Sequence, residues 1–181
     1  MAPQASAPAV ILVSSPTLKD GQPMPRQYTP DGRNDSPPIQ WSSVPPSARE
    51  LMVFCEDPDA GNPPPYVHWV VYHVPPTATG LPEAMPIDPS APLPPELRGT
   101  VQGTNGFRRA IYRGPAPPSG SPHHYHFVVY ALDAVVEQKP HTPPMTRAEL
   151  LDASKGHIVG KGELVATYER HWLCAPLAPR S

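Results

Sequence analysis

The stretch ELMVFCEDPDAGNPPPYVHWVVYHV, residues 50–74, decides the fold because it holds two strand-like runs on either side of a turn. Residues 50–57 and 66–74 are rich in Val, Phe, Tyr and Trp and lack the period of a helix. The residues between them are mostly Pro, Gly, Asp and Asn, which favour turns. The second run has apolar residues on both faces, which is typical of a central strand covered on each side. This stretch therefore predicts the centre of a β-rich core.

Similar β-rich runs recur along the chain at residues 9–15, 38–42, 124–133 and 162–170. The clearest helix is TRAELLDASKG, residues 146–156, in which Thr146 and Glu149 form a capping box. We therefore predict a mainly β fold with few short helices. We expect one domain over residues 1–181, with flexible tails at 1–8 and 175–181.

Charge and composition narrow the classes of function. The chain has 14 Lys and Arg residues against 16 Asp and Glu, which gives a net charge of −2 and no basic surplus for nucleic acid. Its 31 prolines accompany a hydrophobic fraction of 39%, so we expect them to punctuate a fold rather than mark disorder. Residues 75–120 form a long proline-rich segment, which we expect to shape the rim of a pocket.

The two cysteines are too few for a disulfide framework, and Cys55 lies inside an apolar run, where a free thiol behaves as a buried hydrophobe. The N-terminal residues lack the basic region and the long apolar run of a signal peptide. No stretch is long and apolar enough to span a membrane. We therefore expect a cytoplasmic protein.

Polar residues gather where the strands begin and end. If residues 50–57 and 66–74 pair as a hairpin, Asp57 and His68 lie near the same mouth. In SPHHYHF, His123 and Tyr125 share one face of a strand. A carboxylate, two imidazoles and a phenol can form a polar cup for a small anion such as a phosphate group. Alternatively, Asp57 caps its turn, and the histidines are ordinary core or surface residues.

The ordered motifs of the chain resemble the phosphatidylethanolamine-binding protein family, in its bacterial Raf kinase inhibitor-like branch. The resemblance runs from about residue 20 to residue 170. It rests on DGQPMPRQYTPDGRNDSPPIQW (20–41), EDPDA (56–60), HWVVYHVP (68–75), GTNGFRRAIYRGPAPPSG (103–120), HHYHFVVYAL (123–132) and GHIVGKGELVATYER (156–170). The family's fold is a Greek-key arrangement of two antiparallel sheets with few helices, which agrees with the predicted strands.

The resemblance also implies a ligand-binding site. Carried over position by position, it comprises Asp57, Asp59, His68, Gly114, Pro115, Pro117, Pro118, His123 and Tyr125. The sequence departs from the family at His124, which stands where an Arg is usual. Strand alternation turns His124 away from the site, so we expect an altered outer surface rather than a lost site. His126 shares that outer face, and surface or core packing is the expected role of both histidines.

The implied function is non-enzymatic binding of a small anionic or phosphorylated ligand, such as a phosphoethanolamine head group. The alternative is a hydrolase that uses the same residues, either with a metal held by Asp57, His68 and His123 or with an Asp–His pair. No separate catalytic signature supports this alternative, and we expect no cofactor. The resemblance implies a homodimer and leaves any regulatory protein partner unidentified.

Overall fold

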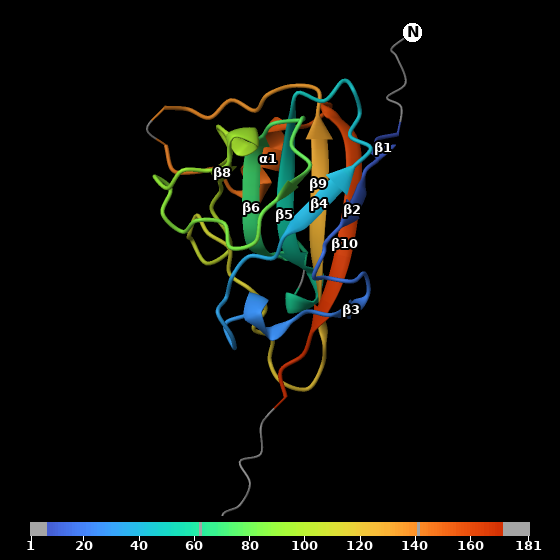
Figure 1. Cartoon of the computed structure of the whole chain (residues 1–181), viewed down its shortest axis with the longest axis vertical. Helices are drawn as coiled ribbons and strands as arrows, with labels where there is room; N and C mark the ends of the chain where they lie inside the picture. The colour runs from blue at the N-terminus through green and yellow to red at the C-terminus, as the bar shows by residue number, and fades with distance from the viewer. Residues whose placement is uncertain (1–6, 62, 141, 172–181) are drawn as a thin grey trace, which may run out of the picture.

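A computed structural model describes residues 7–61, 63–140 and 142–171 and shows a mainly β protein (Figure 1). In chain order, the described elements are β1 (Ala9–Val10), β2 (Leu12–Ser14), β3 (Gln22–Pro23), the 3-10 helix η1 (Arg26–Tyr28), β4 (Ile39–Ser42), β5 (Glu50–Asp57), η2 (Pro58–Ala60), β6 (Tyr66–Val74), β7 (Gly80–Leu81), η3 (Pro95–Leu97), β8 (Val101–Gln102), β9 (His123–Leu132), α1 (Arg147–Ala153) and β10 (Ile158–Tyr168). The two central runs of the opening stretch are therefore strands with the predicted bounds.

The large sheet contains seven of the described strands and is built around the predicted hairpin. Its order is β1-β10-β9-β5-β6-β8, and β3 also pairs with β10. Strand β5 pairs antiparallel with both β6 and β9, and all eight of its residues are buried. The chain thus leaves the hairpin and returns to place β9 on the other side of β5. Two short pairings at the margin, β1 with β10 and β3 with β10, are parallel.

A smaller sheet, in the order β2-β4-β7 over the described residues, crosses in front of the large one in Figure 1. The predicted strand at residues 9–15 is divided between the two sheets, because β1 pairs with β10 and β2 pairs with β4. Ile11, between them, is buried. A Cβ added to Gly162 would lie 1.9 Å from the Ile11 carbonyl oxygen. The passage of the chain from one sheet to the other at Ile11 therefore requires a glycine at this position of β10.

Both faces of the large sheet are covered, as the apolar pattern of the central strands predicts. Leu51, Val53 and Cys55 point into a core shared with the small sheet, whereas Met52 and Phe54 point into a second core on the other face. The second core includes Leu150 of α1, which lies behind the sheet in Figure 1. Helix α1 has the predicted capping box. Arg147 Nε lies 3.0 Å from Glu56 Oε1 and joins the helix to the sheet.

The prediction of a mainly β, two-sheet Greek-key fold with few short helices is confirmed. Residues 175–181 and most of the predicted N-terminal tail lie outside the described residues, as does the second cysteine, Cys174. Cys55 is fully buried, as expected. In the part of the chain that the structure describes, no helix is long and apolar enough to cross a membrane.

Candidate functional site

Three neighbouring strands bring the predicted site residues together at one end of the large sheet, where the strands begin or finish. Strand β5 ends at Asp57, while β6 begins at Tyr66 and β9 begins at His123. Because β5 is antiparallel to both neighbours, these three ends meet at the lower end of the sheet in Figure 1. A cavity of about 680 Å³ lies there.

Most of the predicted site residues line this cavity. They are Asp57, Asp59, His68, Pro117, Pro118, His123 and Tyr125. The remaining two, Gly114 and Pro115, are buried and do not line it. Sequence reasoning missed six further lining residues, which are Ala60, Gly61, Tyr66, Phe107, Arg113 and Ala116.

A β-bulge brings His68 to the cavity side of the sheet. Cys55 pairs with Trp69, but Glu56 pairs with Val67, so His68 is the extra residue of β6. Val67 and Val70 pack against the core on the helix side, whereas Trp69 packs between the sheets. His68 and Trp69 therefore share one face, and strict alternation would have turned the imidazole away. Bulges commonly redirect a side chain in this way beside functional sites.

Asp57 both caps a turn and holds an imidazole. Its Oδ1 accepts a hydrogen bond of 2.8 Å from the backbone N–H of Asp59, and this caps η2. Its Oδ2 lies 2.8 Å from Nδ1 of His123. The side chain of Asp57 is 3% exposed and that of His123 is 13% exposed, so the pair is shielded from water. Asp57 therefore caps its turn and, through its other oxygen, contacts His123.

His68 is held in place by Arg113, which comes directly before the GPAPP residues 114–118 of the rim. Its Nδ1 donates a 2.7 Å hydrogen bond to the backbone carbonyl of Arg113. Its ring meets that of Tyr125 edge to face, with 5.2 Å between the centroids. Burial lowers the pKa of His68, so the ring is neutral at neutral pH. Burial and the nearby Asp57 carboxylate raise the pKa of Tyr125, so its phenol keeps its proton.

The two outer histidines of the HHYH motif each contact a carboxylate outside the cavity-facing pair. Nδ1 of His124 lies 2.7 Å from Oδ2 of Asp59, and its backbone N–H donates to the same oxygen. This hydrogen-bonded contact lowers the pKa of Asp59. His126 lies 3.0 Å from Glu163 on β10. His124 thus connects η2 to the start of β9 from the outside, and His126 connects β9 to β10.

Gly114 supports the rim from beneath. A Cβ on this residue would come within 2.0 Å of the Tyr28 carbonyl oxygen and 2.9 Å of Thr29 Cα. Its backbone N–H donates a 2.9 Å hydrogen bond to Asn34 Oδ1. The rim therefore rests directly on the backbone that follows η1, and only glycine permits so close an approach.

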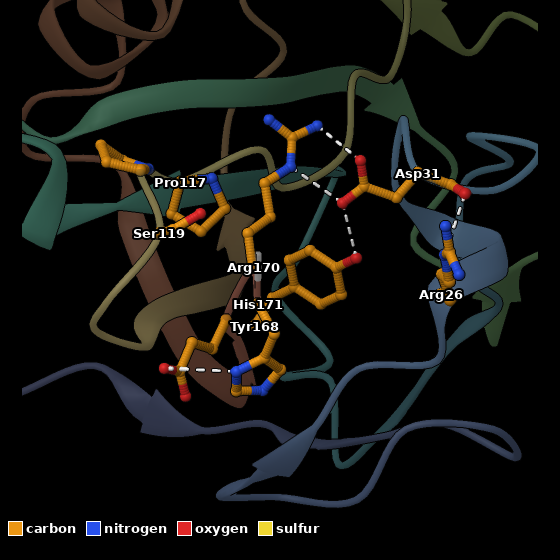
Figure 2. A pocket seen from close by; sticks show the side chains of 9 residues that line it. Arg26, Asp31, Pro117, Ser119, Tyr168, Arg170 and His171 are labelled. Atoms are coloured by element: carbon orange, nitrogen blue, oxygen red, sulfur yellow. Dashed lines mark hydrogen bonds and ion pairs between the residues drawn. The ribbon is translucent and has the colours of Figure 1, made fainter. Parts of the chain in front are cut away.

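A second cavity, of about 670 Å³, shares Pro117 and Pro118 with the first as lining residues. Figure 2 shows the side chains that line it. Here Arg170 makes two hydrogen bonds to the carboxylate of Asp31, of 2.6 and 2.8 Å, and Tyr168 donates a third of 2.8 Å. Contact with Arg170 lowers the pKa of Asp31. The Arg26 Nε donates to the Asp31 carbonyl. The charge of Arg170 is thus compensated within the protein.

The hydrolase alternative requires a metal site, or a nucleophile beside the Asp57–His123 pair. Among the described residues, no group of three or more His, Cys, Asp or Glu side chains is placed to hold a metal ion. The described lining residues of this cavity include no Ser, Thr or Cys that could act as a nucleophile. The arrangement of imidazoles, phenol and guanidinium is suited to holding a polar ligand.

Comparison with known proteins identifies the family. The sequence description of the phosphatidylethanolamine-binding protein family matches residues 14–169. A UPF0098 protein of Methanothermobacter thermautotrophicus is 42% identical over 147 residues, which cover 81% of this chain and 91% of the relative.

Two solved structures agree with this assignment. A putative phosphatidylethanolamine-binding protein homologue from Chlamydia trachomatis is 33% identical, with a TM-score of 0.75 over 90% of this chain and 99% of that one. The YbcL protein of E. coli, described as a new member of the mammalian family, is 31% identical, with a TM-score of 0.78 over 89% of this chain and 99% of that one. The chain belongs to the phosphatidylethanolamine-binding protein family.

Proposed function

We propose that the first cavity binds a small anionic ligand, most simply one with a phosphate group, without covalent chemistry. The observation that carries this proposal is the shared orientation of its two imidazoles. His68 and His123 each use Nδ1 for a contact within the protein, of 2.7 and 2.8 Å, and both line the cavity. Each ring therefore has only Nε2 left for a ligand.

The hydrogen-bond partners fix the tautomers of both rings. A carbonyl or carboxylate oxygen can only accept, so Nδ1 carries the proton in His68 and in His123. In a neutral ring, Nε2 then holds a lone pair, which repels an anionic oxygen. An anionic oxygen that carries no proton of its own therefore needs a second proton on at least one ring, and this proton turns Nε2 into a donor.

His123 is the better placed ring to hold that proton. Asp57 Oδ2 lies against its Nδ1 and acts as the counter-ion of the charged ring. Among the described residues, no carboxylate is in hydrogen-bond contact with His68, and burial lowers the pKa of this imidazole. Tyr125, which keeps its phenolic proton, lies beside the same carboxylate of Asp57. Phosphate binding should therefore draw a proton from solution and weaken as the pH rises.

The test is calorimetric titration of phosphoethanolamine and of inorganic phosphate at pH 6 and pH 8. We expect saturable binding that is weaker at pH 8 and is lost in His123→Ala. The matched control is His157→Ala, because His157 forms a similar 2.8 Å contact with Asp133, and neither residue lines the cavity. The control should bind as the wild type does. No saturable heat at either pH, in protein shown to be folded, would refute the proposal.

A further inference from the structure

Arg113 places a permanent positive charge on the wall of the first cavity. Its guanidinium lies 4.4 Å from the centroid of the Phe107 ring, and both residues line the cavity. Its backbone is fixed to His68 twice, since its carbonyl accepts from His68 Nδ1 at 2.7 Å and its N–H donates to the His68 carbonyl at 3.1 Å. The backbone of this exposed residue is thus anchored beside the imidazole.

This charge has no counter-ion within the described part of the chain. No ion pair there includes Arg113, and the two carboxylates of the cavity, Asp57 and Asp59, pair with His123 and His124 instead. In the second cavity, Arg170 is held by Asp31, whereas Arg26 contacts only the Asp31 backbone carbonyl (Figure 2). Since His68 is neutral at neutral pH, Arg113 is the cation of this wall that does not depend on pH.

The position of Arg113 also disfavours a positively charged group of a ligand at the same place. A ligand ammonium is commonly bound over an aromatic face, but the guanidinium already covers one face of Phe107. The Phe107 ring that the guanidinium covers also contacts His68, with 5.7 Å between the two ring centroids. A ligand held by the imidazoles is therefore close to the guanidinium of Arg113, whose planar set of N–H donors suits a carboxylate or a phosphate.

We infer that Arg113 is a specificity-determining residue that binds a second acidic group of the ligand. This inference rests on the proposed function and makes it more specific. The favoured ligands carry a phosphate group at the imidazoles and a carboxylate or a second phosphate at Arg113. Phosphorylated amines, whose far end is positively charged, are disfavoured.

The test compares phosphoglycolate with phosphoethanolamine, which share a phosphate ester and end in a carboxylate or an ammonium group. Calorimetric titration at pH 7 and low salt should show phosphoglycolate binding about tenfold more tightly to the wild type. In Arg113→Gln this preference should fall to within about twofold. The matched control is Arg108→Gln, which removes the same charge from an exposed position of the same loop that does not line the cavity. The control should keep the wild-type preference.

Inorganic phosphate separates the two ways in which the inference can fail. If phosphate binds but phosphoglycolate has no advantage, or keeps the same advantage in Arg113→Gln, the role of Arg113 is refuted and the anion site stands. Tighter binding of phosphoethanolamine than of phosphoglycolate to the wild type would refute it as well. If none of the three compounds binds to folded protein, the inference falls together with the proposed function.

Discussion

The two cavities that share Pro117 and Pro118 are of similar volume, about 680 and 670 Å³, but they use charge differently. In the second cavity, Asp31 receives hydrogen bonds from Arg170 and Tyr168, so its polar groups mainly hold the protein together. In the first, two Nε2 atoms and the guanidinium of Arg113 lack a partner among the described residues. Size therefore does not distinguish the proposed ligand site from the second cavity, whereas its two largely buried imidazoles with an unused Nε2 do.

Gly114, where the rim meets the segment that carries the second cavity, offers the largest test of this comparison. Gly114→Ala should lower the free energy of unfolding by about 2–3 kcal/mol, because the added Cβ would overlap the Tyr28 carbonyl and both backbones would have to shift. Urea denaturation measures the change. The displaced rim should also weaken phosphate binding.

Gly120→Ala is the matched control for this change in the same loop. Gly120 has a φ of +116°, but no atom lies within 4 Å of the point that an added Cβ would occupy, so its cost is limited to backbone strain of about 1 kcal/mol. Equal losses of stability in the two variants would show that the rim does not rest on the Tyr28 backbone.

The Asp31–Arg170 pair tests whether the second cavity is structural. A double-mutant cycle with Asp31→Asn and Arg170→Gln should give a coupling energy of about 1 kcal/mol, since the two side chains are 24% and 35% exposed and water screens the pair. The affinity for phosphate should be unchanged in all three variants. A fivefold loss of affinity in either single variant would mean that the two cavities act together.

The smallest expected effect is the pH dependence of stability that arises from His68. The pKa of His68 in the folded protein is below the usual value of about 6.5. Just below that pH, His68 is therefore protonated in the unfolded chain but still neutral in the folded one. Stability should therefore decrease as the pH falls from about 7 to 5.

His68→Gln removes this contribution, so its unfolding free energy should decline less steeply over that range. The carboxylates of Asp31 and Asp59, whose pKa values are lowered, affect stability only at about pH 4 and below. They therefore do not change the slopes compared between pH 7 and pH 5. Parallel slopes for wild type and variant in urea denaturation between pH 7 and pH 5 would contradict the assigned neutral state of His68.

Much of the fold could be predicted from the sequence, because apolar runs with β-rich composition report burial directly. The bounds of β5 and β6 followed from this signal. The division of residues 9–15 at Ile11 did not, because a strand that changes sheets keeps the same composition throughout. The close approach of Gly162, which makes the crossing possible, comes from a part of the chain about 150 residues away.

The candidate site was predictable where residues lie in motifs at strand ends, as Asp57, His123 and Tyr125 do. The bulge at His68 was hidden, because a shift in register between two strands leaves no mark on either strand alone. Phe107 and Arg113 lie in a long segment without periodicity, which gives no indication of where its side chains point. The position of Arg113, directly before the GPAPP residues of the rim, was the one sequence feature that could have indicated a cation at the cavity.

Proton uptake on binding tests the account most directly. Sulfate is a suitable probe, because it is a tetrahedral dianion that does not titrate near neutral pH, so any proton taken up must reside on the protein. Titration at pH 7 in two buffers of different ionisation enthalpy should give different heats, corresponding to uptake of part of a proton, and His123→Ala should abolish both the binding and the uptake. Saturable binding of sulfate that His123→Ala leaves intact, or no binding to folded protein, would contradict a cavity whose imidazoles must be charged to receive an anion.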